Sequence, residues 1–369
     1  MTVKDLHRES MKFNDLALLA KFDNDIYKVK ENFFKAFEFE KQAFILFNRS
    51  SNEEPTRSIL VRSAANLAIL SEEFREAEKL ISIGLAGDIS EEFANEFRDL
   101  LQQINFFRHL ELKGIVLNTD ELQLSLAGNQ VGHGMIRSDE FLNRIDIIEK
   151  IAYRTADRLR KNPFADNAKS KKDNVINFEP YLSVPRAASF AVTIRFGQIP
   201  SQQVLEGMDI QSVLIDDILS NIQLINEENY LKLNENIQDE TYRNNFIALA
   251  KQLAPDGDRI KLVGFTTTKN SKNITVTLTK PTNRIEPYTI PKKNKVTVID
   301  EPVELEGVLS FADSKKSKIK LTNNENTDFE IVVPNGLLSD IVKPFFEDVV
   351  FIKGIKSGKK IILNDISKK

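Results

Sequence analysis

The sequence predicts a multi-domain α+β protein, with helical hairpins at the N-terminus, a mixed α+β domain in the middle and a small β-barrel at the C-terminus. Three observations support this fold class. Apolar residues recur at three- and four-residue steps up to about residue 109, hairpins alternate with helices between residues 110 and 280, and short strands surround one helix after residue 303. A chain of 369 residues is too long for one core of ordinary size. We therefore expect domains at 1–109, 110–280 and 303–369, with a linker at 281–302.

The clearest element is a helical hairpin between Pro55 and Gly87. Between Ser58 and Leu70 the apolar and small residues form one helical face. Ser71-Glu72-Glu73 is a short break, and a second helix starts at about Phe74. Gly87 is a plausible stop for this second helix.

A similar pattern occurs 48 residues earlier, which indicates an internal repeat. Eight positions align at this fixed offset: Leu16 with Ala64, Ala17 with Ala65, Leu19 with Leu67, Ala20 with Ala68, Ile26 with Phe74, Val29 with Ala77, Phe33 with Ile81, and Ala36 with Gly84.

These two units resemble tetratricopeptide repeats over roughly residues 10–105. That family carries a small residue where Ala65 stands, and an alanine, a large apolar residue and a small residue where Ala77, Ile81 and Gly84 stand. The period departs from the family, because it is 48 residues instead of about 34. Ile89 also stands where the family has a closing proline. The resemblance implies a concave surface that binds a protein segment; the alternative is a helical domain that packs only on the rest of this chain.

Further elements are predicted from the pattern of apolar residues and turn residues. They are a capping helix at Ser90–His109, two strands joined at Asn118-Thr119-Asp120, a helix at Ser138–Arg160, a hairpin at Tyr181–Phe196, helices at Asp209–Ile225, Asn226–Ile237 and Asp239–Leu253, and a hairpin formed by Arg259–Thr268 and Asn273–Thr279. This order lacks the strand–helix–strand rhythm of a parallel nucleotide-binding sheet.

The C-terminal region reads as three strands, a helix and two strands. The strands are Val303–Phe311, Lys318–Thr322, Phe329–Val333, Val349–Ile355 and Lys360–Leu363, and the helix is Gly336–Phe345. This order resembles that of an oligonucleotide/oligosaccharide-binding (OB) barrel. A small SH3-like barrel is the competing interpretation.

The composition excludes several classes of site. The chain has no cysteine and three histidines without ligand spacing, so we expect no metal, no cofactor and no catalytic residue. The net charge of −3 argues against a surface that grips nucleic acid everywhere. The N-terminus has no signal-peptide pattern and no apolar run is long enough to span a membrane, so a cytoplasmic location is expected. The many Lys, Asn and Ile residues suggest a bacterial source.

A glycine loop between residues 128 and 138 is the one place where we would look for a small ligand. Gly132, His133, Gly134, Arg137 and Ser138 follow a predicted strand and precede a helix, where anions bind. The loop is neither a Walker loop nor a dinucleotide fingerprint. The alternative is a turn with no ligand.

Two groups of lysines are candidates for nucleic-acid contact. One group is Lys169, Lys171 and Lys172 in a polar loop, and the other is Lys316, Lys318 and Lys320 on the barrel. Phe311 and Phe329 could stack on bases, but we expect both in the barrel core. The absence of arginine after residue 296 weakens this hypothesis.

The favoured hypothesis is a non-enzymatic interaction protein that binds a protein partner through its helical repeats. Arg57, Arg62 and Asn66 on the first helix of the second hairpin are the predicted partner-binding residues. An accessory or neutralising subunit of a bacterial defence or toxin-type complex is one such setting, by analogy. The alternatives are a nucleic-acid-binding protein that uses the barrel, and an enzyme or small-ligand binder at the glycine loop.

Overall fold

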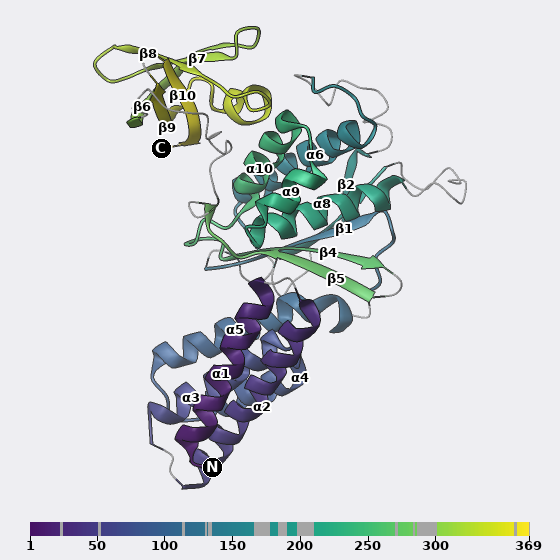
Figure 1. Cartoon of the computed structure of the whole chain (residues 1–369), viewed down its shortest axis with the longest axis vertical. Coiled ribbons are helices and arrows are strands. Elements are labelled where there is room, and N and C mark those ends of the chain that lie inside the picture. The colour runs from purple at the N-terminus through teal and green to yellow at the C-terminus, as the bar shows by residue number, and fades with distance from the viewer. Residues whose placement is uncertain are drawn as a thin grey trace. The chain divides into compact units, whose positions relative to one another are not determined.

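Figure 1 shows the computed structural model of the chain. The described residues are 1–22, 25–50, 53–112, 115–129, 131, 135–165, 178–183, 190–197, 210–269, 272–282, 285, 301–357 and 360–368. The chain divides into two compact units, Met1–Gly114 and Ile115–Lys369. Helices fill the first unit, and two sheets with covering helices make up the second, so the predicted mixed α+β class is confirmed.

The first unit, called here the helical unit, contains five helices. They are α1 (Val3–Phe22), α2 (Ile26–Ser50), α3 (Thr56–Leu70), α4 (Phe74–Leu85) and α5 (Glu91–Leu112), and each packs on the next in sequence. The α3–α4 hairpin has nearly the predicted bounds. Its turn is closed by a hydrogen bond of 2.8 Å from the Glu73 amide to the Ala68 carbonyl, next to Glu72 in a left-handed conformation. Phe37, Ile81, Phe97 and Ile104 fill the core of this unit.

Burial differs between the two helical hairpins at some of the aligned positions. Ala64 and Leu67 of α3 are buried, whereas their counterparts in α1, Leu16 and Leu19, are exposed. The small residues behave alike, because Ala17 and Ala65 are both fully buried. The small residues of the 48-residue pattern therefore mark the packed side of each helix, whereas Leu16 and Leu19 of α1 are exposed.

The second unit is organised around an antiparallel sheet with the strand order β2-β3-β1-β4-β5. Its strands are β1 (Glu121–Ala127), β2 (Pro180–Leu182), β3 (Phe190–Phe196), β4 (Leu262–Lys269) and β5 (Lys272–Leu278). Every strand pair of this sheet is antiparallel, as the absence of a strand–helix–strand rhythm predicts. Only one strand forms near Asn118, however. The predicted first strand is wrong, because the buried Leu117 donates its amide to the side-chain hydroxyl of Thr268 in β4 and not to a backbone carbonyl of a strand.

Helices cover one face of this sheet (Figure 1). They are α6 (Ser138–Leu159), α8 (Ile210–Asn226), α9 (Tyr230–Asn236) and α10 (Glu240–Leu253), close to the predicted bounds. Leu122 and Leu124 of β1 belong to the core beneath them. The opposite side of the strands is polar: Thr193, Gln123, Thr266 and Thr275 form one row of cross-strand partners, and the last two share a hydrogen bond of 2.9 Å.

The C-terminal part of the second unit is a closed five-stranded barrel. Its strands are β6 (Glu301–Asp313), β7 (Lys318–Thr322), β8 (Asp328–Val332), β9 (Val349–Ser357) and β10 (Lys360–Lys368). The barrel closes through the antiparallel β6–β9 pair and the parallel β8–β10 pair. The element between β8 and β9 is a π-helical turn, η2 (Leu338–Val342), followed by a 3-10 turn, η3 (Lys343–Phe345). The predicted order of three strands, a helical element and two strands is therefore confirmed.

Candidate functional site

The first candidate is the glycine loop between β1 and α6. Gly128 fits tightly against the segment that leads into β4, because a Cβ atom there would lie 2.2 Å from the Arg259 carbonyl oxygen. The Lys261 amide donates a hydrogen bond of 2.9 Å to the Ala127 carbonyl beside it. Three of the predicted ligand residues, Gly132, His133 and Gly134, lie outside the described part of the chain.

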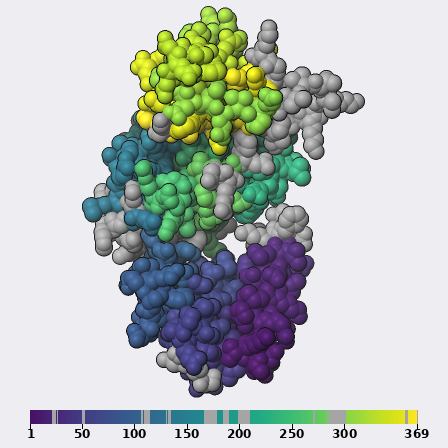
Figure 2. Space-filling model, turned by 90° about the vertical axis from the view of Figure 1, so that its left-hand side faces the viewer, coloured from purple at the N-terminus to yellow at the C-terminus, as the bar shows by residue number. Residues whose placement is uncertain are grey.

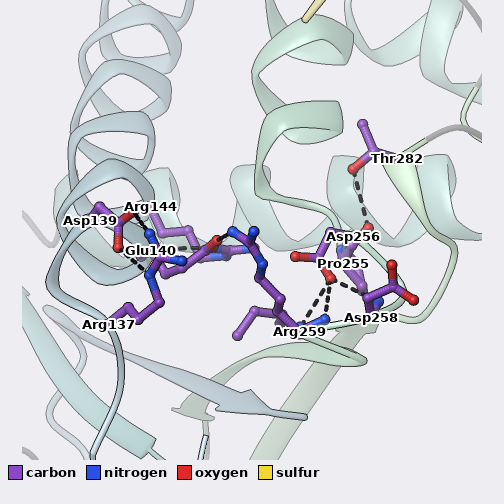
Figure 3. Close-up of polar contacts among 10 residues, drawn as sticks. Arg137, Asp139, Glu140, Arg144, Pro255, Asp256, Asp258, Arg259 and Thr282 are labelled. Carbon is purple, nitrogen blue, oxygen red and sulfur yellow. Dashed lines mark hydrogen bonds and ion pairs between the residues drawn. The ribbon is translucent and has the colours of Figure 1, made fainter. Parts of the chain in front are cut away.

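The start of α6 is occupied by its own carboxylates (Figure 3). Arg137 precedes the helix, which has no side-chain cap, and donates to both carboxylate oxygens of Asp139 at 3.0 and 2.6 Å. The hydrogen bonds from Arg137 lower the pKa of Asp139 below its ordinary value. An anion at Ser138 would have to compete with this carboxylate for Arg137.

Glu140 connects α6 to the loop before β4. It accepts a hydrogen bond of 2.5 Å from Arg144, and its other oxygen lies 3.4 Å from Arg259 (Figure 3). One oxygen of Asp256 accepts from three successive amides, including that of Arg259 at 2.8 Å, which fixes the loop. Each arginine in this cluster has a carboxylate partner. This arrangement joins α6 to the loop before β4.

The second candidate is the exposed side of α3. This helix lies in the middle of the helical unit, and most of its side chains are buried. The exposed or half-exposed side chains after its first residue form a single row, called here the α3 stripe: Ile59, Arg62, Ser63, Asn66 and Leu70. Steps of three, four and seven residues place them on one face of the helix. The stripe ends in two apolar side chains, Ile59 at 41% and Leu70 at 45% exposure.

The three predicted partner-binding residues have different surroundings. Arg57 is only 7% exposed, and its guanidinium donates to the Asn48 side chain at 3.2 Å and to the Ile83 carbonyl at 2.9 Å, so it joins α2, α3 and α4. Arg62 is half-exposed, forms an ion pair with Glu96 and lies over the Phe93 ring at 5.6 Å. Asn66 is exposed in the middle of the α3 stripe.

The apolar members of the α3 stripe were missed in the sequence, where Ile59 is expected on the packed face. The signal that could have found them is their spacing from Asn66, since Ile59 and Leu70 fall seven residues before it and four after it. Leu18 of α1, which stands 48 residues before Asn66, is exposed as well. Exposed apolar side chains in contiguous patches mark interaction sites.

The third candidate is the outer face of the barrel. Lys318 forms an ion pair with Glu330, and Lys320 lies 3.8 Å from Asp328 on the neighbouring strand. Lys316 is exposed in the β6–β7 turn, where its amide donates to Asp313. The lysines at 169, 171 and 172 lie outside the described residues. The predicted phosphate-binding charge on β7 is therefore compensated by acids.

Phe311 is not in the barrel core, contrary to the expectation from the sequence. It is 46% exposed, and the Lys320 ammonium lies 5.9 Å from its ring. The β6 ladder shifts register between Leu309 and Phe311, which turns Phe311 outward although its spacing from the buried Leu309 would place it inside. Phe329 packs partly against the core, as expected.

Comparisons with known proteins do not assign a family. No protein-family model matches the chain, and neither curated proteins nor solved structures give a match. Within the described residues, no helix has the length and apolar character needed to cross a membrane. The same residues contain no group of three or more histidine, aspartate and glutamate side chains placed to hold a metal ion. The Nδ1 atom of His7 lies 2.9 Å from a carboxylate oxygen of the buried Glu40, which is a pair and not a group of three.

Proposed function

We propose that this chain is a non-enzymatic interaction protein, and that its helical unit binds a segment of a partner protein along the α3 stripe. The observation that carries the proposal is the pair of exposed apolar side chains, Ile59 and Leu70, on a central helix most of whose side chains are buried. A partner that covers an exposed isoleucine and an exposed leucine removes apolar surface from water, which favours binding. The helical unit is the purple-to-blue part of Figure 2.

The geometry of the stripe limits the partner. Ile59 and Leu70 are eleven residues apart, which is about 16 Å along a helix at 1.5 Å per residue. A three-turn helix or about five extended residues would span this distance. Between the two ends, Asn66 offers an amide, and the charge of Arg62 is compensated by Glu96. The stripe therefore favours a segment with two apolar side chains and a hydrogen-bonding group between them, without a net charge.

The test is affinity purification of the tagged chain from extracts of its host, followed by mass spectrometry. Wild type is compared with the double variant Ile59→Asp and Leu70→Asp. The matched control is Ile83→Asp on α4, because Ile83 has the same 41% exposure as Ile59. A stoichiometric protein that is retained by wild type and by the control but lost from the double variant supports the proposal, provided that thermal melts show all three folded.

Equal capture by the wild type and the double variant would contradict this use of the α3 stripe. Loss of the partner from the Ile83→Asp control as well would indicate that any new charge on the helical unit disrupts binding. In that case the stripe has no special role, and the proposal fails.

Nucleic-acid binding is the second candidate, and the exposure of Phe311 beside Lys320 favours it. Aromatic side chains on a barrel face can stack on bases of single strands. The acids Asp328 and Glu330 oppose it, because they neutralise the neighbouring lysines. A binding site for a small ligand at the glycine loop stays a prediction, since Gly132–Gly134 lie outside the described residues.

A further inference from the structure

In the described structure, ion pairs connect the barrel to the helices that cover the five-stranded sheet, a contact called here the joint, and they all have the same polarity. The cations come from α6 and α10, and the carboxylates come from the barrel. Arg154 of α6 contacts Asp340 of η2 at 2.6 Å, and Lys251 of α10 contacts Asp365 of β10 at 2.6 Å. Lys150 of α6 lies 3.4 Å from the Asp340 carbonyl oxygen.

Asp340 is the centre of this joint. The carboxylate oxygen that accepts from Arg154 also accepts from Asn245 of α10 at 2.9 Å. Asn245 donates to the Gly336 carbonyl as well, at 2.7 Å. Arg154, Asn245 and Asp340 are all buried. The Asp340 side chain thus contacts both α6 and α10 of the neighbouring module.

The backbone of the barrel approaches α10 closely at the same place. Gly336 has a φ angle of +86°, and a Cβ atom there would lie 2.6 Å from the Thr241 carbonyl oxygen. Leu337 and Ile341, which follow Gly336 in the chain, are buried in the shared core. These contacts define a single docked position of η2 on α10.

The joint also contains features that weaken it. A cavity of about 380 Å³ that is open to solvent lies at the joint, and its lining includes Phe164 and Thr241 on one side and Ser314, Ser317 and Ser339 on the other. The buried Asn245 Oδ1 and Ser339 Oγ have no hydrogen-bond partner within the described structure. Unpaired buried polar atoms and a desolvated ion pair both cost free energy.

We infer that the barrel docks reversibly on the helices of the neighbouring module and that Asp340 holds it in the docked position. Apolar contact and ion pairs close the joint in one position, whereas the cavity, the orphan polar atoms and the desolvation of Arg154 reduce the net gain. The joint combines apolar contacts with buried polar pairs, and relative motion between modules of one chain is expected unless their interface is large and hydrophobic. The barrel closes its own sheet and the neighbouring module has its own, so the joint can open while both stay folded. This inference is independent of the proposed use of the α3 stripe.

Hydrogen exchange of the full-length chain, followed by mass spectrometry, tests the inference. In the variant Asp340→Asn the buried Arg154 loses its ion-pair partner, which strongly destabilises a contact of this kind. We expect exchange at residues 336–345 and in α10 to rise at least about tenfold. Exchange in β7, β8, β1 and β3 should stay at the wild-type rate. The control Glu330→Gln breaks an exposed ion pair on the same barrel and should change nothing at the joint.

A second variant covers the outcome in which Asp340→Asn fails to fold. Lys251→Gln removes only the second ion pair and should raise exchange at the same joint residues by a smaller factor. Faster exchange throughout the barrel and the five-stranded sheet together, in either variant, would overturn the inference, because the two modules would then unfold as one. Unchanged exchange at residues 336–345 in both variants would also overturn it, because Asp340 and Lys251 would then hold nothing closed.

Discussion

The ring of Phe97 in α5 lies directly on Gly84 in α4. A Cβ atom at Gly84 would be 2.4 Å from the Cζ atom of Phe97 and 2.7 Å from both of its Cε atoms. Phe97 is fully buried, so its ring has no free space to move into. The absence of a side chain at Gly84 thus sets how closely these two helices pack.

The variant Gly84→Ala should therefore destabilise the helical unit. Overpacking costs about 1–3 kcal/mol, and the better helix propensity of alanine returns up to about 1 kcal/mol. Urea unfolding measures the difference. In the double variant Gly84→Ala with Phe97→Leu, the smaller side chain should recover part of the loss caused by the alanine. If Gly84→Ala is as stable as wild type, the described contact is wrong.

A second prediction concerns the dependence of stability on pH. Hydrogen bonds from Lys41 at 2.7 Å and Lys79 at 2.6 Å lower the pKa of Glu76 from 4.5 to about 2. A folded-state pKa below the unfolded one contributes stability above pH 4.5, and this contribution is lost as the pH falls towards 2. Because the Glu76 side chain is 28% exposed, we expect about 1 kcal/mol.

Glu76→Gln should accordingly cost about 1 kcal/mol at pH 7 and almost nothing near pH 2. Urea unfolding at both pH values measures this. Glu91→Gln is the control, since Glu91 forms a highly exposed pair with Arg98 and should show little effect at either pH. An equal loss at pH 7 and pH 2 would show that the charge of Glu76 is not responsible.

The bounds of α3 and α4 and the turn between them were predicted well because their signals are local. The break at Ser71-Glu72-Glu73 is confirmed as a tight turn, and α4 begins at Phe74 as expected. The barrel order is confirmed for the same reason, since each strand is short and bounded by turn residues. Alternation also identified both hairpins of the five-stranded sheet.

What the sequence did not reveal depends on contacts between distant residues. Arg57 looks like a surface residue in the sequence, but three helices enclose it. Arg154 and Asp340 are 186 residues apart and carry no local sign of their pairing. Periodicity also cannot say which leucines of α1 have a neighbour, so Leu16 and Leu19 were placed on a packed face and are exposed.

A third prediction tests the charge balance of the barrel. In the double variant Asp328→Asn and Glu330→Gln, the lysines Lys318 and Lys320 lose their acidic partners. Affinity for a single-stranded oligonucleotide at low salt should then rise, with a salt slope steeper by about 0.7 for each lysine that meets a phosphate. Fluorescence anisotropy measures both quantities. Tight binding by wild type that these substitutions leave unchanged would contradict the account of a compensated face.

A fourth prediction compares two glycines that are needed for different reasons: close packing at Gly128 and a positive φ angle at Gly257. Gly128→Ala places a methyl group against backbone atoms of Arg259 and Lys261, so we expect a loss of about 3 kcal/mol. A Cβ atom at Gly257 would make only an ordinary contact of 3.8 Å with Pro281, but the φ angle is +93°, so Gly257→Ala should cost only about 1–2 kcal/mol of backbone strain. Chemical unfolding of the two variants gives the order. A smaller loss at Gly128 than at Gly257 would mean that β1 and β4 can move apart.

The central claim is that the helical unit binds a protein partner. The most direct measurement is capture of partners by the tagged chain, with and without nuclease, in wild type and in the double variant Ile59→Asp and Leu70→Asp. The account predicts one stoichiometric protein that survives nuclease treatment and disappears only in the double variant. Recovery of nucleic acid, with every associated protein lost on nuclease treatment, would contradict it and favour the barrel as the binding module.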